Sequence, residues 1–160
     1  MQRAEKSIRV AAPVAEVYGF WRDFENLPRF MEHVKEVRRV GSDQELWRWT
    51  IKGPLNSSFS FDARLTEDQP NRAIGWNSLE GALGTSGVVT FTELDDNTEV
   101  HVLMQWFDTP AGRAGESLSR IFQDPDKMLD EDLRRFKDVM ERRVRQEVWE
   151  RLASKSILED

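Results

Sequence analysis

Residues 58–65 read SFSFDARL, with apolar and polar side chains alternating at every position. Side chains two residues apart share one face of a β-strand, so this pattern predicts a strand with one buried face and one exposed face. Residues 47–52, WRWTIK, alternate in the same way. The intervening Gly53-Pro54 is a turn signal, and the two segments together predict an antiparallel hairpin.

The same alternation of apolar and polar side chains continues on both sides of this hairpin. Between His33 and Asp108, further turn signals stand at residues 41–43, 69–71, 80–81 and 95–97. No helical pattern separates the alternating segments, so hairpins must join them and the sheet should be antiparallel. We expect six strands in this region and one more at residues 3–10.

Three segments have helical spacing. Pro13 fits the first turn of a helix over residues 13–21, and Asn26 could cap a short second helix that turns Phe30 and Met31 inward. Asp124 and Pro125 are a strong start signal for a helix over about 125–153. An apolar stripe runs along this last helix, with positions three and four residues apart: Leu129, Leu133, Phe136, Met140 and Val144.

Composition excludes several classes of function. The 160 residues include no cysteine and two histidines, so we expect no disulfide, no thiolate zinc site, no metal centre and no cofactor. The formal net charge of -6 disfavours nucleic acid as a partner. We find neither a signal peptide nor a run of 18 apolar residues, and therefore expect a cytoplasmic protein.

The sequence also resembles a known family. The matching segments follow one another along residues 3–142 and are APV (12–14), FENLPRFM (24–31), DARL (62–65), IGWNS (74–78), GVVTF (87–91) and DLRRFK (132–137). They are similar to the START-like, or SRPBCC, helix-grip superfamily, and within it to bacterial cyclase/dehydrase proteins similar to coenzyme Q-binding proteins.

The resemblance implies an α+β fold in the order β-α-α-β6-α. A curved, seven-stranded antiparallel sheet would surround the long C-terminal helix and enclose a pocket for a lipid, quinone or polyketide-like molecule. Residues 1–142 would form this domain. Residues 143–160 would be a helical extension of the same domain, beyond the point where the family's last helix commonly ends.

Candidate ligand contacts are the inward-facing residues of the predicted sheet and last helix. They are Trp47, Trp49, Phe59, Phe61, Trp76, Ser78, Val89, Phe91, Met104, Trp106, Phe136 and Met140. Sites for hydrophobic ligands are mostly apolar with a few polar groups, which this set matches. The alternative is that these side chains simply fill the core, since each aromatic residue buries roughly 150–250 Å².

Connection 108–123 carries three apolar residues, Leu118, Ile121 and Phe122, that could act as a lid over the pocket or pack as ordinary core. Binding or carriage of a hydrophobic small molecule is our first hypothesis. A polyketide cyclase or dehydratase is the second, although no set of ionisable residues plainly faces inward, and only Glu36 or Arg38 could turn in from an irregular strand. An interaction module with a filled core is the third. We expect His33 and His101 to be solvated.

The C-terminal extension continues the apolar stripe with Val148, Trp149 and Leu152. A helix of about 28 residues would be roughly 42 Å long, which exceeds the width of such a sheet. A homodimer through residues 143–160 would cover the stripe, and a frayed, charged tail is the alternative. Transient membrane contact is a further expectation, through the lid of connection 108–123 and not through this extension.

Overall fold

A computed structural model describes residues 2–79, 83–108 and 124–159. The elements of the first half are β1 (Gln2–Val10), α1 (Val14–Arg22), the 3-10 helix η1 (Phe24–Arg29), β2 (Val34–Val40), β3 (Asp43–Lys52) and the 3-10 turn η2 (Pro54–Asn56). Those of the second half are β4 (Ser58–Gln69), β5 (Ala73–Ser78), β6 (Leu83–Leu94), β7 (Asn97–Asp108) and α3 (Pro125–Glu159). This order confirms the predicted α+β fold.

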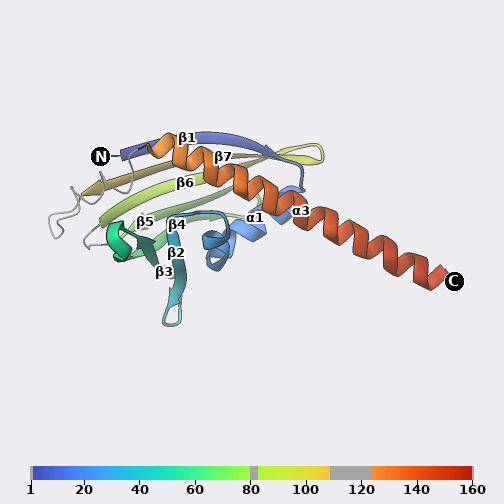
Figure 1. The fold of residues 1–160 in the computed structure, drawn as a ribbon, viewed down its shortest axis with the longest axis horizontal. Helices are drawn as coiled ribbons and strands as arrows, with labels where there is room; N and C mark the ends of the chain where they lie inside the picture. Colours follow the sequence, from blue (N-terminus) through green and yellow to red (C-terminus); the bar gives the residue numbers. More distant parts are fainter. Residues whose placement is uncertain (1, 80–82, 109–123, 160) are drawn as a thin grey trace.

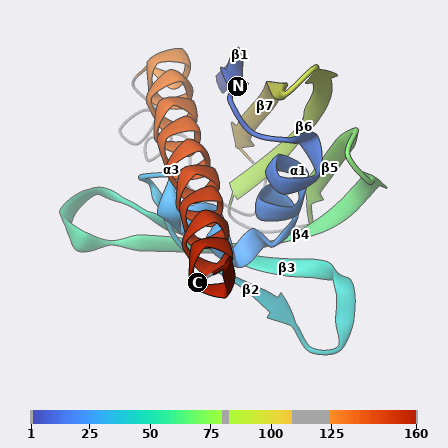
Figure 2. The ribbon, with the colours of Figure 1, turned by 90° about the vertical axis from the view of Figure 1, so that its right-hand side faces the viewer.

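The sheet has seven strands in the order β1-β7-β6-β5-β4-β3-β2, and every neighbouring pair is antiparallel. It remains open, with β1 and β2 at its two edges. The strands curve, and α3 runs along their concave side (Figure 1). Figure 2, which looks along α3, shows α1 beside it on the same side of the sheet. This is the helix-grip architecture.

The predicted alternation decides which side chains form the core. Trp47, Trp49 and Ile51 of β3 are buried, as are Phe61 and Ala63 of β4. The stripe on α3 is received by this face, with Leu129, Leu133, Phe136 and Met140 all buried. The ring of Phe136 has three aromatic neighbours within 4.9–6.1 Å between ring centroids, namely Phe20, Trp21 and Phe30.

Strand β2 departs from simple alternation for a structural reason. Its pairing with β3 shifts register between Val34 and Glu36, so that Val34 and Val37 both turn inward and are buried. A bulge of this kind inserts an extra residue into one strand and changes the face that later residues occupy. Glu36 and Arg38 pair with each other in an exposed salt bridge, so neither supplies the interior charge considered from sequence.

Two helix-end predictions had different outcomes. The Asp124 cap is confirmed, because its Oδ1 accepts the backbone N–H of Lys127 at 3.1 Å. The Asn26 cap is wrong: Asn26 lies inside η1, and its Nδ2 donates to the carbonyl of Phe20 at 3.1 Å. Helix α3 also continues to Glu159, six residues past the predicted end.

Helix α3 is fixed to the body of the protein near its middle. Lys137 Nζ donates to the carbonyl of Arg9 at 2.9 Å, and Glu141 Oε2 accepts the N–H of Ala11 at 2.8 Å. Among the described side chains of α3, half-buried Val144 is the last that packs against the core. With 35 residues the helix is about 52 Å long, and its C-terminal part projects away from the sheet (Figure 1).

Candidate functional site

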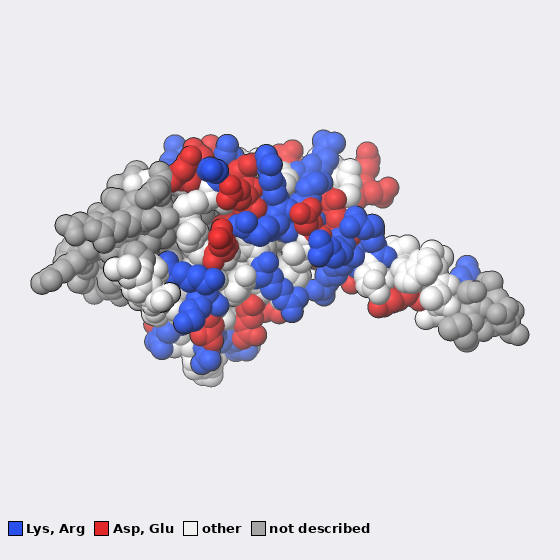
Figure 3. Space-filling view, in the orientation of Figure 1, with Lys and Arg blue, Asp and Glu red and all other residues white. Residues whose placement is uncertain are grey.

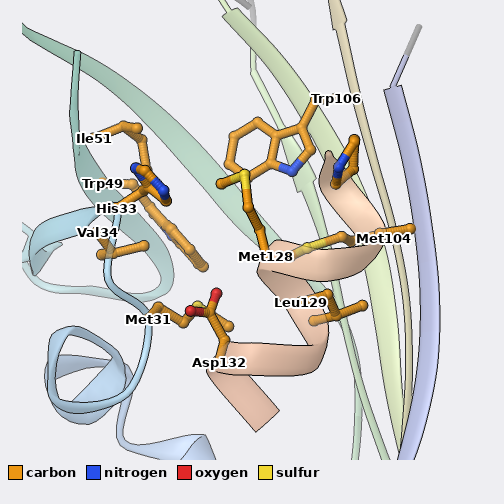
Figure 4. Close-up of a pocket in the computed structure, with 12 residues that line it drawn as sticks. Met31, His33, Val34, Trp49, Ile51, Met104, Trp106, Met128, Leu129 and Asp132 are labelled. Carbon is orange, nitrogen blue, oxygen red and sulfur yellow. The ribbon is translucent and has the colours of Figure 1, made fainter. Parts of the chain in front are cut away.

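A cavity of about 40 Å³ lies at the N-terminal end of α3, where the helix faces β1, β3 and β7 (Figure 4). Most of its wall is apolar. The lining residues are Ala4, Met31, His33, Val34, Trp49, Ile51, Met104, Trp106, Pro125, Met128, Leu129 and Asp132. The alternation of the strands brings Trp49 and Ile51 to the cavity from β3, and Met104 and Trp106 from β7.

One side of the cavity is a wall of packed aromatic rings. Trp49 stacks on Phe61 and Trp76, with centroid distances of 5.8 and 6.4 Å, and Trp106 meets the edge of Phe61 at 6.0 Å. Such rings are held on several sides and move little. This wall therefore has a fixed shape.

Flexible side chains form another part of the wall. Met31, Met104 and Met128, three of the chain's five methionines, line the cavity. Methionine is unbranched and has three rotatable bonds, so it adapts its shape to what it contacts. The present volume is well below the roughly 300 Å³ of a small ligand site. A ligand of that size therefore requires the methionines to move.

Asp132 is the acidic group of the cavity, and its carboxylate points into it (Figure 4). Burial raises the pKa of this carboxyl to about 6, although the backbone N–H of Glu32 at 3.3 Å and the guanidinium of Arg135 both favour the ionised form. Arg135 also donates to the carbonyl of Phe30 at 2.9 Å, which ties α3 to the end of η1. Asp132 is thus held in place and is close to half-protonated at pH 6.

His33 is the second ionisable group of the cavity and stands between η1 and β2, beside Trp49 and Ile51 in Figure 4. Its burial lowers the pKa of the imidazole, which is therefore neutral at pH 7. His33 is partly buried and lines the cavity, so the expectation of a solvated His33 holds only in part. His101 lies on the outer face as predicted, within hydrogen-bond distance of the Ser7 hydroxyl at 2.6 Å.

The expectation that no ionisable side chain faces the interior is therefore wrong. The sequence did contain a signal for Asp132, because it follows Leu129 by three residues and precedes Phe136 by four, and so lies beside the buried stripe. For His33 we find no comparable signal, because it precedes a strand whose alternation is broken.

The structure brings three of the sequence-derived candidates to the cavity: Trp49, Met104 and Trp106. Other candidates lie in the surrounding core and are Trp47, Phe61, Trp76, Val89, Phe91, Phe136 and Met140, with Phe59 partly buried against it. Ser78 is also partly buried, and its hydroxyl accepts the N–H of Thr85 at 2.8 Å. The lid candidates Leu118, Ile121 and Phe122 fall outside the described residues.

One buried donor in the core has no partner. The indole Nε1 of Trp47 makes no hydrogen bond to any described residue, although the side chain is buried and packs edge-on against Phe24 at 5.1 Å. An unsatisfied buried donor costs about 1–3 kcal/mol, so such groups call for an explanation.

Two further features concern the described parts of the chain only. Within residues 2–79, 83–108 and 124–159, no three histidine or acidic side chains come together in a group that could hold a metal ion. None of the helices that the structure describes is long and apolar enough to span a membrane.

Known proteins are similar to this chain in sequence and in fold. A 17.2 kDa protein from the melC2-rnhH intergenic region of Streptomyces lincolnensis is 32% identical over 145 residues, which are 89% of this chain and 92% of that protein. The crystal structure of DR_A0006 from Deinococcus radiodurans is similar with a TM-score of 0.70 and 28% identity, covering 88% of this chain and 98% of the other.

The Zhui aromatase/cyclase from Streptomyces sp. R1128 also has a TM-score of 0.70, with 20% identity, and the alignment covers 89% of this chain and 95% of that one. At this identity the likeness concerns the fold. Residues 10–127 match the family described as "Polyketide cyclase / dehydrase and lipid transport". The chain belongs to this polyketide cyclase/dehydrase family of helix-grip proteins.

Proposed function

We propose that this protein binds a hydrophobic small molecule that carries a hydrogen-bonding group, in the cavity at the N-terminal end of α3. The observation that carries the proposal is an apolar cavity with two ionisable side chains, Asp132 and His33. The apolar wall would hold the body of the ligand, and the two polar side chains would fix the orientation of its polar end. A lipid, a quinone or a polyketide-like molecule has this character.

Accommodation of the ligand depends on the methionines. With Met31, Met104 and Met128 rotated, the cavity of about 40 Å³ would extend along the aromatic wall formed by Trp49 and Trp106. Reorientation of a methionine exchanges one staggered conformation for another and leaves the backbone in place. A ligand that reached deeper along β3 would approach Trp47, whose unpaired Nε1–H could then donate to a carbonyl oxygen.

The test is to fill the cavity. Ala4 is buried in β1 opposite Met104 and lines the cavity, so Ala4→Val adds two carbon atoms where the ligand would lie. Ala63→Val is the matched control, because Ala63 is equally buried in a strand but does not line the cavity. We expect wild type and Ala63→Val purified from the native host to release a stoichiometric organic ligand on solvent extraction, and Ala4→Val to release much less.

Absence of any ligand from the wild type, together with no saturable binding of quinone or fatty-acid probes, would contradict the proposal. Equal loss of ligand in both variants would also contradict the assigned location, because it would mean that packing in general, and not this cavity, controls binding.

A second candidate function is polyketide cyclisation or dehydration, and the pKa shifts favour it. A carboxyl with a pKa of about 6 can donate a proton near neutrality, and a neutral imidazole can accept one. Ring closure by aldol addition needs a base to remove a proton from carbon and an acid to protonate the carbonyl oxygen. Asp132 and His33 would perform these steps on a substrate bound between them.

Asp132→Asn separates the two functions. The amide keeps the shape of the carboxyl but cannot transfer a proton, so a binding protein would retain ligand affinity within a few-fold. A cyclase would lose about 10²–10⁴-fold in rate. The assay is ring formation from a poly-β-ketone thioester, followed by mass spectrometry. Unchanged turnover in Asp132→Asn would remove Asp132 from the mechanism.

A further inference from the structure

The C-terminal part of α3 carries an apolar surface that the body of the protein does not cover. Val148, Trp149 and Leu152 are 46%, 69% and 57% exposed, respectively. They lie four to eight residues past Val144, the last described side chain of the helix that packs on the core. On a helix of 3.6 residues per turn, the three side chains share one face. We call residues 142–155, which comprise the turn around Val144 and the part of the helix beyond it, the overhang.

The charges of the overhang are arranged around this apolar face. Each apolar residue stands seven residues, or two turns, from a basic one: Arg142 and Trp149, Arg145 and Leu152, Val148 and Lys155. The apolar face is therefore flanked and interrupted by exposed cations.

The acidic residues of the overhang lie on the other half of the helix. Glu147 pairs with Arg143 at 3.7 Å, and Glu150 accepts a hydrogen bond from Gln146 at 3.0 Å. Residues 142–155 hold five basic and two acidic side chains, so their net charge is +3. Because the whole chain has a net charge of -6, the rest of the chain has a net charge of -9. Figure 3 shows lysine and arginine gathered where α3 leaves the body, and a stretch of uncharged surface beyond.

We propose that the overhang docks on an anionic lipid surface, with Val148, Trp149 and Leu152 inserted between the headgroups and Arg142, Arg145 and Lys155 against the phosphates. An interfacial helix combines these features: an apolar face that includes tryptophan, basic residues around it and acidic residues on the side facing water. Arginine and lysine reach the headgroups with their charged ends while their stems stay on the apolar side.

The geometry of the molecule permits this docking despite the acidic body. Leu152 lies eight residues, about 12 Å, beyond Val144 along the helix. The Debye length at physiological salt is about 8 Å, so repulsion between the body and the membrane is largely screened at this distance. The C-terminal part of α3 also extends beyond the strands, so no strand lies beside it (Figure 1).

A second copy of the chain fits the same face less well. A two-fold interface places one surface patch against its own copy. Arg142, Arg145 and Lys155 of both molecules would then meet in one contact, and like charges oppose association. The charge of the face therefore favours a lipid surface over self-pairing.

The experiment is co-sedimentation of the full chain with phosphatidylcholine vesicles, with and without about a third phosphatidylserine. Each basic residue near an anionic surface contributes about 5-fold in affinity, so the three predict roughly 100-fold tighter binding to the anionic vesicles. Arg145→Gln should weaken this binding about 5-fold. Arg151→Gln, the matched control, removes the same charge one turn past Glu147 and should change binding less than about 2-fold.

Trp149→Ser tests the apolar contact and should lower binding to vesicles of both compositions while circular dichroism stays unchanged, because the side chain is 69% exposed. No preference for anionic vesicles, or equal effects of Arg145→Gln and Arg151→Gln, would overturn the proposal. So would a dimer in light scattering that Trp149→Ser converts to monomer, since the face would then belong to a second copy. The assay uses protein without added ligand, so its outcome is independent of the cavity.

Discussion

The raised pKa of Asp132 predicts how the stability of this protein depends on pH. The carboxyl has a pKa of about 6 in the folded protein, against a usual value of 3.8, and the main cause is burial. A difference of about 2 pKa units corresponds to about 3 kcal/mol between the two protonation states. The side chain is only 15% exposed, so solvent screening reduces this figure little.

The direction of the pH dependence follows from the number of protons that the folded and unfolded states bind. Between about pH 4 and pH 6 the folded protein holds the Asp132 proton and the unfolded chain releases it, so the free energy of unfolding falls as pH rises. This contribution is fully present below the unfolded pKa and is lost through the folded pKa of about 6. Asparagine does not titrate. Relative to wild type, Asp132→Asn should therefore gain about 2–3 kcal/mol in stability from pH 4 to pH 7.

The measurement is urea unfolding of both proteins at several pH values in this range, followed by tryptophan fluorescence. Asp130→Asn is the control on the same helix, where the side chain is 42% exposed and pairs with Arg134. Asp130→Asn should change the free energy of unfolding by less than about 1 kcal/mol at each pH, because exposed ion pairs contribute little to stability. The stability gained by Asp132→Asn is the free energy of unfolding of the variant minus that of wild type. If this difference stayed constant, or became smaller as pH rises, burial would not control the pKa of this carboxyl.

Three further substitutions test the packing of the core around the cavity and the start of α3. Phe136→Ala removes a fully buried ring and should cost about 3–5 kcal/mol, measured by chemical unfolding; less than about 1 kcal/mol would mean that the core is loosely packed. Gly87→Ala would place a Cβ 2.4 Å from the Trp76 ring and 2.8 Å from the backbone carbonyl oxygen of Leu103, so a loss of about 1–3 kcal/mol is expected, and no loss would show that both the indole and the strand shift freely. Asp124→Ala removes the cap on the N–H of Lys127 and should cost about 0.5–2 kcal/mol in thermal unfolding, whereas Asp124→Asn should restore most of the stability; equal losses in the two variants would exclude the capping role.

Much of the fold could be predicted from local patterns. Alternation in residues 47–52 and 58–65 identifies inner and outer faces correctly, because a strand has a strict period of two. The stripe from Leu129 to Met140 and the cap at Asp124 locate the long helix equally well. The sequence shows that strand β2 is irregular, but the inner and outer faces of this strand could not be assigned, since a bulge changes faces without any residue that marks it.

The site was predicted only in part, and the reason is geometric. Trp49, Met104 and Trp106 share the inner face with Phe61 and Trp76, yet only the first three line the cavity. Periodicity assigns a residue to a face. Periodicity does not predict which residues on that face line a cavity, because the position of a cavity depends on how the end of α3 packs against the curved sheet.

By itself, the sequence determined the order of the elements, the antiparallel pairing and the apolar interior, because each follows from spacing along the chain. Only the tertiary structure decided that Asp132 and His33 share one cavity and that this cavity is small. It also decided that α3 continues past the sheet with its apolar face uncovered. These properties depend on side chains from distant segments filling a common space, and local spacing does not encode that volume.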